Sequence, residues 1–367
     1  MYLHPALAQG RSALRALIAR AKLPPGTPLI VAVSGGSDSM ALAHIARFVA
    51  NKDGYRIVCV TVDHGVREGS ANEAALVARW LRDEGIEDVR TIRVQIDKDG
   101  GPEAGARNAR YSTLESVAIE TGGVVLLGHT QDDQAETLLL GLSRGSGPRS
   151  LAGMAPLAQL PTSTRGTLAL RPLLHIRRRD LRAALRSENV AWVDDPTNEP
   201  DGEWRAKDGK PLTRNAIRHT ALPALREAVG DGVTRALADT ADLLRRDNDA
   251  LDMIAGQELE RMKNEGSYVE TTDTEKVARV GETVIVVQRE SLLRLHPALS
   301  TRILRLCALK CGARAGELSR THIDSMEKIT RGQHGHRYAD IPGAQCERRG
   351  KLIVLSGVKK SPENATH

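Results

Sequence analysis

The chain has 367 residues, of which 41% are hydrophobic and 27% charged, and its 52 Lys and Arg exceed its 46 Asp and Glu to give a formal net charge of +6. These values predict a globular protein of two or three domains, and they exclude a membrane-spanning chain because no apolar run approaches about 20 residues. The aromatic content of 2% excludes an extended surface for stacking bases.

The first 22 residues carry charges among their apolar positions, which predicts a helix of a cytoplasmic protein and not a signal peptide. Four cysteines, Cys59, Cys307, Cys311 and Cys346, are scattered along the chain. Their spacing fits neither a disulfide framework nor a set of metal ligands, so we expect a reducing compartment and no metal site built from them.

Short apolar runs alternate with helical patterns from residue 28 to residue 143. Strands are predicted at 29–33, 57–65, 90–96 and 123–130, and helices at 38–51, 70–84, 104–121 and 133–143. This alternation predicts an α/β fold with a parallel sheet and helices on both faces. Polar clusters end three of the strands, so we expect these clusters to meet at the carboxyl edge of the sheet, where such sheets bind ligands.

The cluster after the first strand reads Ser-Gly-Gly-Ser-Asp-Ser, residues 34–39. Its glycines and the following helix N-terminus predict a nest of backbone N–H groups for an anion, to which the serines add hydroxyl donors. Neither G-x-x-x-x-G-K-[ST] nor G-x-G-x-x-G is present. A carboxylate would repel the anion, so we expect Asp38 to act with Mg²⁺ or at a leaving group. The alternative is a tight strand-to-helix turn.

An arginine-rich segment follows the Gly/Pro/Ser-rich stretch 152–167, which we expect to be a surface loop. Residues 165–186 contain seven arginines and one acid, a local charge of 7 − 1 = +6. We expect a helix here, with Arg177, Arg178 and Arg179 in contact with RNA phosphates. The alternative is a solvated helix face.

The second half of the chain predicts a long helix at 231–264, followed by a small α/β module. The domain boundaries follow from these patterns. We expect a first domain at 1–215, a helical linker region at 216–265, a small α/β domain at 266–358 and a disordered tail at 359–367.

Several motifs follow one another along the chain: SGGSDS, VDHGVREGSANEA (62–74), EAGARNARY (103–111), GHTQDDQAETLLLGLSRGSG (128–147), RPLL (171–174), and DDPTN followed by RNAIRHTALPAL (194–225). The first resembles the pyrophosphate-binding loop of the N-type ATP pyrophosphatases, the PP-loop superfamily. Together, in this order, they resemble tRNA(Ile)-lysidine synthetase over residues 28–225. The resemblance implies a Rossmann-like PP-loop catalytic domain, and a tRNA-binding role for the small C-terminal domain.

The reaction implied by the resemblance is a ligation that forms a carbon–nitrogen bond in two steps. ATP, with Mg²⁺, adenylates the C2 oxygen of the wobble cytidine in an isoleucine tRNA with a CAU anticodon, and pyrophosphate leaves. The ε-amine of free L-lysine then attacks C2 and displaces AMP, which gives lysidine. The resemblance implies a cytoplasmic enzyme without membrane contact, and it leaves a homodimer open.

The resemblance also implies roles for individual residues. Catalytic roles fall on Asp38, Arg107, His129 and Asp133, and ATP contacts on Ser34, Gly35, Gly36, Ser37, Asp38, Ser39, Asp63 and His64. Substrate and tRNA contacts fall on Arg67, Arg110, Asp132, Glu136, Asp195, Asn198, Arg214, Asn215 and Arg218. We expect Asp133 to attract the lysine ammonium and take its proton; the alternative is that it only caps its helix.

Two other functions stay open. A tRNA 2-thiocytidine synthetase uses the same adenylation but needs cysteines beside the ATP site, and only Cys59 lies in the first 300 residues, within a predicted strand. A non-catalytic tRNA-binding protein would have no need of the polar loop and the carboxylates. Thr130 stands where family members often carry a second His, so no role that requires two imidazoles is carried over.

Overall fold

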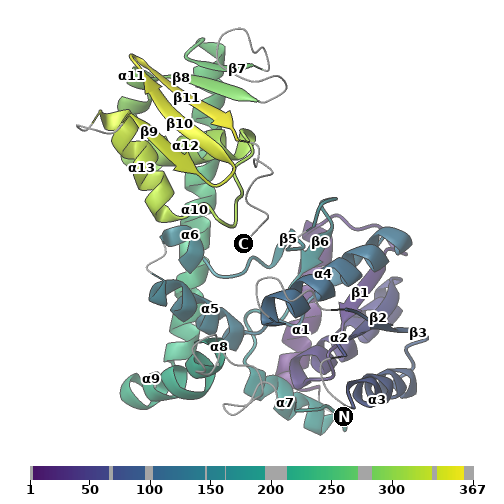
Figure 1. The fold of residues 1–367 in the computed structure, drawn as a ribbon. Coiled ribbons are helices and arrows are strands. Elements are labelled where there is room, and N and C mark those ends of the chain that lie inside the picture. Colours follow the sequence, from purple (N-terminus) through teal and green to yellow (C-terminus); the bar gives the residue numbers. More distant parts are fainter. Residues whose placement is uncertain are drawn as a thin grey trace. The chain divides into compact units, whose positions relative to one another are not determined.

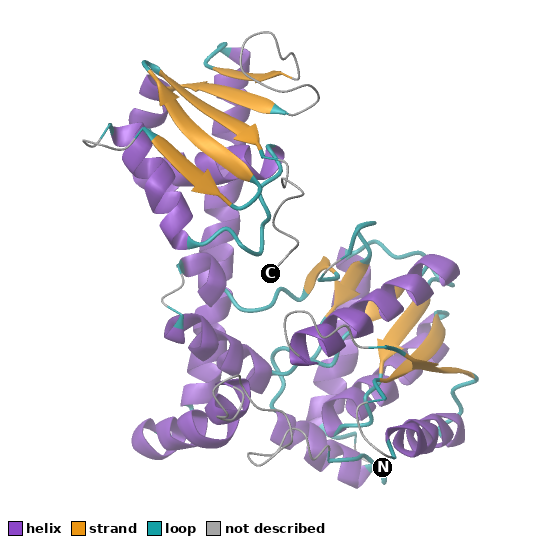
Figure 2. Cartoon of the chain, in the orientation of Figure 1, coloured by secondary structure: helices purple, strands orange, loops and turns teal. Residues whose placement is uncertain are grey.

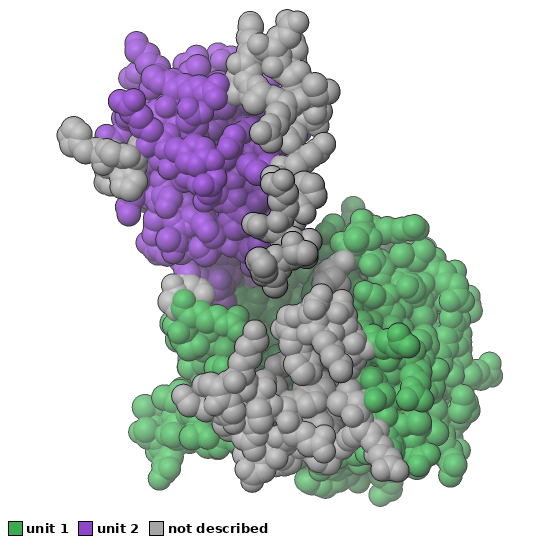
Figure 3. Space-filling model, in the orientation of Figure 1, with its two compact units in different colours: residues 1–144, 151–242 green, residues 145–150, 243–367 purple. Residues whose placement is uncertain are grey.

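The computed structural model describes residues 3–65, 69–95, 102–144, 147–161, 163–194, 213–271, 283–332 and 337–358. The chain divides into two compact units, 1–144 with 151–242 and 145–150 with 243–367 (Figure 3). The domain boundaries expected at residues 215 and 265 stay predictions, and the expected tail at 359–367 lies outside the described residues.

In the described part of the first unit, a six-stranded sheet has the order β3-β2-β1-β4-β6-β5. Its strands are β1 (Pro28–Ala32), β2 (Arg56–Asp63), β3 (Asp88–Arg93), β4 (Val124–Leu126), β5 (Leu157–Gln159) and β6 (Leu168–Leu170). Neighbouring strands run parallel except at the edge, where β5 is antiparallel to β6. Because β2 and β4 flank β1, the segments that follow these three strands leave the sheet at the same edge.

Helices cover both faces of this sheet (Figures 1 and 2). The described helices up to Asn264 are α1 (Pro5–Arg20), α2 (Ser37–Asp53), α3 (Ser70–Asp83), α4 (Pro102–Thr121), α5 (Gln131–Ser143), α6 (Pro148–Leu151), α7 (Arg178–Ser187), α8 (Thr213–Ala216), η2 (Ile217–Ala221), α9 (Leu222–Val229) and α10 (Val233–Asn264). Of these, α6 lies largely in the second unit and α10 continues into it. In β1, Leu29 and Val31 pack in a core with α1, α2 and α7, whereas Ile30 packs on the opposite face with Tyr111 of α4. The predicted α/β fold is therefore confirmed.

Two segments differ from the expectation. The stretch 152–167 is not wholly a loop, because it contains β5, which pairs with β6. The arginine-rich segment 165–186 is not one helix: it begins with β6, and α7 begins only at Arg178. Ala169 and Leu170 are fully buried beside β4, and they pair with it as a strand. By themselves, the arginines around them suggest one continuous charged helix.

The second unit contains an antiparallel sheet with the order β7-β8-β11-β10-β9. Its elements are β7 (Tyr268–Thr271), β8 (Val284–Gln288), α11 (Arg289–Leu293), α12 (Pro297–Lys310), α13 (Arg320–Arg331), β9 (Tyr338–Ile341), β10 (Ala344–Arg349) and β11 (Leu352–Gly357). Ile303 of α12 and Ile329 of α13 pack with Ile353 and Leu355 of β11 in one core. This is the small α/β module expected at the C-terminal end. Within the described residues, no helix is long and apolar enough to cross a lipid bilayer.

Candidate active site

The loop between β1 and α2 has the geometry expected of an anion-binding turn. Gly35 adopts φ +87°, a conformation that favours glycine, and a Cβ there would also lie 2.6 Å from Val77 Cγ2. Ser39 Oγ accepts a hydrogen bond from Ser34 N at 3.2 Å and donates one to Gly36 O at 2.9 Å. These bonds fix the loop at the N-terminus of the 17-residue helix α2, where free N–H groups and the helix dipole favour an anion.

The turn between β4 and α5 packs directly against the start of α2. A Cβ on Gly128 would lie 3.1 Å from the carbonyl oxygen of Asp38, so only glycine allows this approach without a shift. Thr130 and Asp133 then form a capping box at the start of α5: Asp133 Oδ2 accepts hydrogen bonds from Thr130 N and Thr130 Oγ1, each at 2.8 Å. The expected convergence of the polar clusters after β1 and β4 is thus present.

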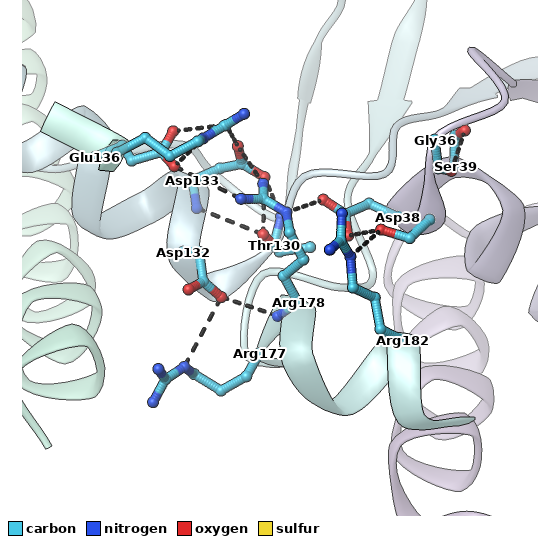
Figure 4. A network of polar contacts seen from close by, with 12 residues as sticks. Gly36, Asp38, Ser39, Thr130, Asp132, Asp133, Glu136, Arg177, Arg178 and Arg182 are labelled. Carbon is cyan, nitrogen blue, oxygen red and sulfur yellow. Dashed lines mark hydrogen bonds and ion pairs between the residues drawn. The ribbon is translucent and has the colours of Figure 1, made fainter. Parts of the chain in front are cut away.

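Three carboxylates and three guanidinium groups meet beside this loop, and Figure 4 shows Arg178 between Asp38 and Asp133. Arg178, from the first turn of α7, donates from Nε to Asp38 Oδ2 at 2.7 Å and from Nη2 to Asp133 Oδ1 at 3.2 Å. Glu136, with its side chain only 1% exposed, accepts from Arg214 Nε at 3.0 Å and from Arg218 Nε at 2.7 Å.

These six residues form what we call the carboxylate–arginine cluster: Asp38, Asp133, Glu136, Arg178, Arg214 and Arg218. Its formal charges are equal, three negative and three positive. Its side chains come from four segments of the chain, and Arg178 lies 140 residues from Asp38.

Burial acts differently on the two aspartates of the cluster. Burial raises the pKa of Asp38, and the nearby negative charge of Asp133 adds to this effect against the opposing charge of Arg178. Burial would also raise the pKa of Asp133, but the positive charges of Arg178 and Arg214 outweigh it and hold that pKa well below its usual range. Asp133 is therefore a firmly ionised carboxylate, and a weak proton acceptor while the arginines remain bound.

Asp132 points away from this cluster, as its helix position predicts. It accepts a hydrogen bond from the backbone N of Arg178 at 2.9 Å and another from Arg226 Nη2 at 2.9 Å, and Arg177 Nε lies 3.8 Å away. Asp132 thus binds the N-terminus of α7 and orients Arg178.

The arginines of the predicted RNA-binding set occupy three different environments. Arg179 is exposed and pairs with Asp231 on the surface, whereas Arg177 lies against Asp132. Arg178 is inside the carboxylate–arginine cluster, so its guanidinium does not lie on a surface open to RNA. Its predicted contact with RNA stays untested, but the alternative of a solvated helix face is wrong for this residue.

Two arginines were not singled out from the sequence. Arg182 donates from Nε to Ser37 Oγ at 3.1 Å, and Arg226 binds Asp132. Helical spacing could have indicated Arg182, since it follows Arg178 by four residues on α7 and therefore shares its face.

Of the remaining predicted residues, Asp63 and His64 lie at the carboxyl end of β2. Asp63 ends β2, beside β1, and accepts a hydrogen bond from Gly65 N at 2.9 Å; His64 follows it. Asn215 is buried in α8. Arg67, Asp195 and Asn198 lie outside the described residues.

Arg107 and Arg110 belong to α4, whereas His129 lies between β4 and α5, near enough to the carboxylate–arginine cluster for the charges of Asp133 and Arg214 to act on it. The guanidinium carbons of Arg107 and Arg110 lie 4.9 and 5.3 Å from the ring centre of Tyr111. Burial lowers the pKa of His129 to about 3; the negative charge of Asp133 opposes this shift, and the charges of Arg171 and Arg110 act in the same direction as burial. The imidazole of His129 is therefore neutral at neutral pH.

Comparisons with known proteins agree with this arrangement. The family model of the PP-loop domain matches residues 11–225. The chain is 41% identical over 353 residues to the tRNA(Ile)-lysidine synthase of Thermobifida fusca, which covers 95% of this chain and 98% of that protein. It is 40% identical over 338 residues to the tRNA(Ile)-lysidine synthase of Streptomyces coelicolor, covering 91% and 87%.

One solved structure shares the fold at low sequence identity. It is the U34-tRNA thiolase NcsA from Methanococcus maripaludis with its [4Fe-4S] cluster, with a TM-score of 0.52 and 14% identity, covering 67% of this chain and 85% of that one. At this identity the likeness extends to the fold alone.

Proposed function

Because the chain belongs to the tRNA(Ile)-lysidine synthase family of PP-loop proteins, we propose that it uses ATP to join lysine to C2 of the wobble cytidine in the CAU-anticodon isoleucine tRNA. The products are lysidine, AMP and pyrophosphate. The observation that carries the proposal is that Arg178 connects the loop at residues 34–39 with the carboxylates of α5, so that one site contains both an anion nest and acidic side chains.

In the first step, the C2 oxygen of cytidine attacks the α-phosphorus of ATP, the bond from that phosphorus to the bridging oxygen breaks, and pyrophosphate leaves. The N-terminus of α2 and the hydroxyls of the loop serines bind the departing pyrophosphate, because its negative charge grows as the bond breaks. Asp63 and His64 lie beside β1 and complete the ATP site.

Mg²⁺ suits the donor set at this edge. It prefers one or two carboxylates together with phosphate oxygens, and Asp38 presents a carboxylate within the loop that binds the phosphates. When bound, Mg²⁺ would neutralise charge on the phosphates. Asp38 would then exchange its contact with Arg178 for the metal ion, which leaves that arginine available to the phosphates.

In the second step, the ε-amine of lysine attacks C2, the bond from C2 to the oxygen of the adenylate breaks, and AMP leaves. Asp133 and Glu136 supply the negative charge that binds the lysine ammonium, and Arg214 and Arg218 occupy those carboxylates in the described arrangement. Asp133 takes a proton only once these arginines move, because their charges keep its pKa low.

The two roles considered for Asp133 do not exclude each other. Its Oδ2 closes the capping box of α5, while its Oδ1 faces Arg178, Arg214 and Arg218. One carboxylate can therefore cap its helix and present its second oxygen to a cation. Asp133 as the partner of the lysine ammonium stays the proposal.

The small C-terminal α/β module is proposed to bind tRNA. Supporting this, the guanidinium groups of Arg289 and Arg348 converge at Gly332, where a Cβ would lie 2.9 and 2.5 Å from them. Arg289 also donates from Nε to the carbonyl of Thr330 at 2.6 Å, which holds it at the end of α13. Clustered arginines supply the sequence-independent part of RNA affinity. We further propose a cytoplasmic location, and the homodimer stays open.

A tRNA 2-thiocytidine synthetase is the alternative enzyme, and Cys59 argues against it. Sulfur transfer requires an accessible thiolate beside the ATP site. Cys59 is fully buried in β2, and burial raises the pKa of its thiol to about 12. The thiol of this cysteine is therefore inert in the described arrangement.

Mass spectrometry of nucleosides tests the proposal directly. A CAU-anticodon isoleucine tRNA transcript is incubated with the protein, ATP, Mg²⁺ and lysine, and we expect lysidine together with stoichiometric AMP and pyrophosphate. Omission of lysine should abolish lysidine, and a transcript with a GAU anticodon is the matched control. A tRNA-binding protein without catalysis would bind the transcript and leave both nucleosides and ATP unchanged.

A further inference from the structure

A second polar cluster lies on the α4 face of the sheet, where β4 and β6 end. Leu126 of β4 pairs with Leu170 of β6, and Leu127 N donates to Leu170 O, so the two segments leave the sheet side by side, with Arg171 one residue after β6 and His129 three residues after β4. Leu127 and Ala169, two residues earlier in each segment, belong to the core beneath Tyr111. The period of two along strands thus directs His129 and Arg171 to the same side as Tyr111.

This cluster contains buried polar atoms without hydrogen-bond partners: Arg110 Nε, Tyr111 Oη, His129 Nδ1 and Arg171 Nε. Tyr111 is 1% exposed and Arg171 is 5% exposed. Each buried donor that lacks an acceptor costs about 1–3 kcal/mol, so several together in one place require an explanation.

The cluster also carries uncompensated positive charge. Among the described residues, no carboxylate lies within ion-pair distance of Arg110 or Arg171, although Arg171 Nη1 donates to Ala155 O at 2.9 Å. The neutral imidazole of His129 adds no positive charge, and the carboxylate whose charge acts on it is Asp133 of the carboxylate–arginine cluster. The arginines of the carboxylate–arginine cluster, by contrast, each face acids. Buried charges are ordinarily paired, and here the missing partner is an anion.

Exposure increases from the floor of the cluster to its rim, which gives an anion a way in. Tyr111 and Arg171 are buried, Arg110 and His129 are half-buried, and Arg107 is exposed beside the ring of Tyr111. His129 directly follows Gly128, which packs on the backbone of Asp38. The cluster is therefore next to the loop that binds the phosphates of ATP.

We propose that Arg110, Tyr111, His129 and Arg171 form a binding pocket for a phosphate group of the substrates, in which Arg171 and Tyr111 are phosphate-binding residues. The inference rests on the proposed function, since that reaction brings two kinds of phosphate to this edge of the sheet. One is the α-phosphate of ATP and of the adenylate, and the other is a phosphodiester of the tRNA next to the reacting cytidine. Three N–H or O–H donors match the oxygens of either phosphate.

The test uses the full chain with Arg110→Gln, Arg171→Gln and Tyr111→Phe, and Arg20→Gln as a matched control at an exposed position of α1. Binding of ATP, and binding of the CAU transcript at several salt concentrations, are measured by equilibrium titration without turnover. We expect each glutamine variant to weaken the binding of one of the two ligands about tenfold, which is the effect of losing a hydrogen bond to a charged group. If weakened ATP binding accompanies unchanged tRNA binding, the α-phosphate is the ligand. If tRNA binding weakens and the slope of log affinity against log salt concentration becomes smaller by about 0.7–0.9, the ligand is a phosphodiester of the tRNA.

Tyr111→Phe separates binding from folding. Removal of a buried hydroxyl that has no partner should leave the melting temperature unchanged or raise it, while the same change weakens the ligand severalfold. Arg171→Gln also removes a hydrogen bond to Ala155 O and could destabilise the fold for that reason. If it does, the binding measurements on Tyr111→Phe and Arg110→Gln test the proposal. If Tyr111→Phe and Arg110→Gln both bind ATP and tRNA as tightly as the wild type does, the proposed phosphate pocket is wrong. Wild-type lysidine formation, measured separately, tests the reaction itself.

Discussion

Arg178 donates from Nε to Asp38 Oδ2 at 2.7 Å, and this bond joins the loop at residues 34–39 to helix α7. The same guanidinium binds Asp133 and lies 3.7 Å from Glu136, so one cation holds three carboxylates that would otherwise repel one another. Each of these carboxylates is proposed to bind a cation of the reaction, either Mg²⁺ or lysine. If these proposals hold, Arg178 must give up its contacts with the carboxylates before Mg²⁺ and lysine bind there.

Asp38→Asn should separate catalysis from folding. Because burial raises the pKa of Asp38, its charge is unfavourable in the folded state, and a neutral amide should change the free energy of unfolding by less than about 1 kcal/mol. Lysidine formation should fall about 100-fold or more, since the amide is a poor ligand for Mg²⁺.

Asp53→Asn is the matched control for this variant, at the other end of α2, where Asp53 Oδ2 binds Arg15 Nε at 2.6 Å. It should retain activity. Rates are measured by the yield of lysidine, and stability by thermal melting. Turnover of Asp38→Asn near that of the wild type would show that Asp38 only shapes the turn.

Asp133→Asn should lower stability and stop the second step. The low pKa of Asp133 means that its charge stabilises the fold, and its removal leaves Arg178 and Arg214 undercompensated, at a cost of about 3 kcal/mol. Adenylated tRNA should form and accumulate, because lysine loses the carboxylate that attracts it. The measurement follows adenylate and lysidine in single-turnover reactions at a temperature where the variant is folded.

Thr130→Val provides the comparison for Asp133→Asn. It removes the hydroxyl of the capping box and keeps the charge of Asp133, so it should cost about 1 kcal/mol of stability and still yield lysidine. Normal lysidine formation by Asp133→Asn would mean that this carboxylate serves only as a cap.

Arg179→Ala tests contact between α7 and RNA without disturbing the site. Arg179 is exposed, and its surface pair with Asp231 contributes about 0–1 kcal/mol, so the melting temperature should hardly change. If Arg179 contacts a phosphate, the slope of log affinity against log salt should decrease by about 0.7–0.9. Arg235→Ala, which removes another exposed arginine that pairs with an aspartate, is the control. Equal slopes for the two variants would exclude an RNA contact at Arg179.

Much of the site follows from sequence because parallel strands end at one edge of a sheet. The loop 34–39 and the segment beginning at Gly128 follow β1 and β4, which are neighbours, so their convergence could be predicted from the alternation of strands and helices. The sequence also predicts that Asp133 and Glu136 lie close together, since they are three residues apart on one helix.

The partners of these carboxylates could not be predicted. Arg178 stands in a run of three arginines, and the sequence does not say where α7 begins. The first residue of α7 is Arg178, and this start directs residues 178 and 182 inward and Arg179 outward. Arg171 belongs to the same charged stretch, yet it follows a buried strand and is itself buried. Long-range packing decides these environments, and local charge does not.

His129 should make stability depend on pH. Burial lowers the pKa of His129 from its ordinary value to about 3, so between about pH 6.5 and 3 the unfolded chain binds a proton that the folded chain excludes. Stability should therefore fall as the pH decreases through this window, by at most about 1.4 kcal/mol per pH unit for one histidine. Above about pH 7 the histidine is neutral in both states and contributes no slope. Urea unfolding from pH 7.5 to 4.5 measures the effect, and the fluorescence of Trp80 and Trp192 reports on the first unit. His129→Gln should remove this share of the slope, while His44, whose pKa is also lowered by burial, keeps its own share. An unchanged slope in His129→Gln would show that the imidazole of His129 accepts a proton in the folded state.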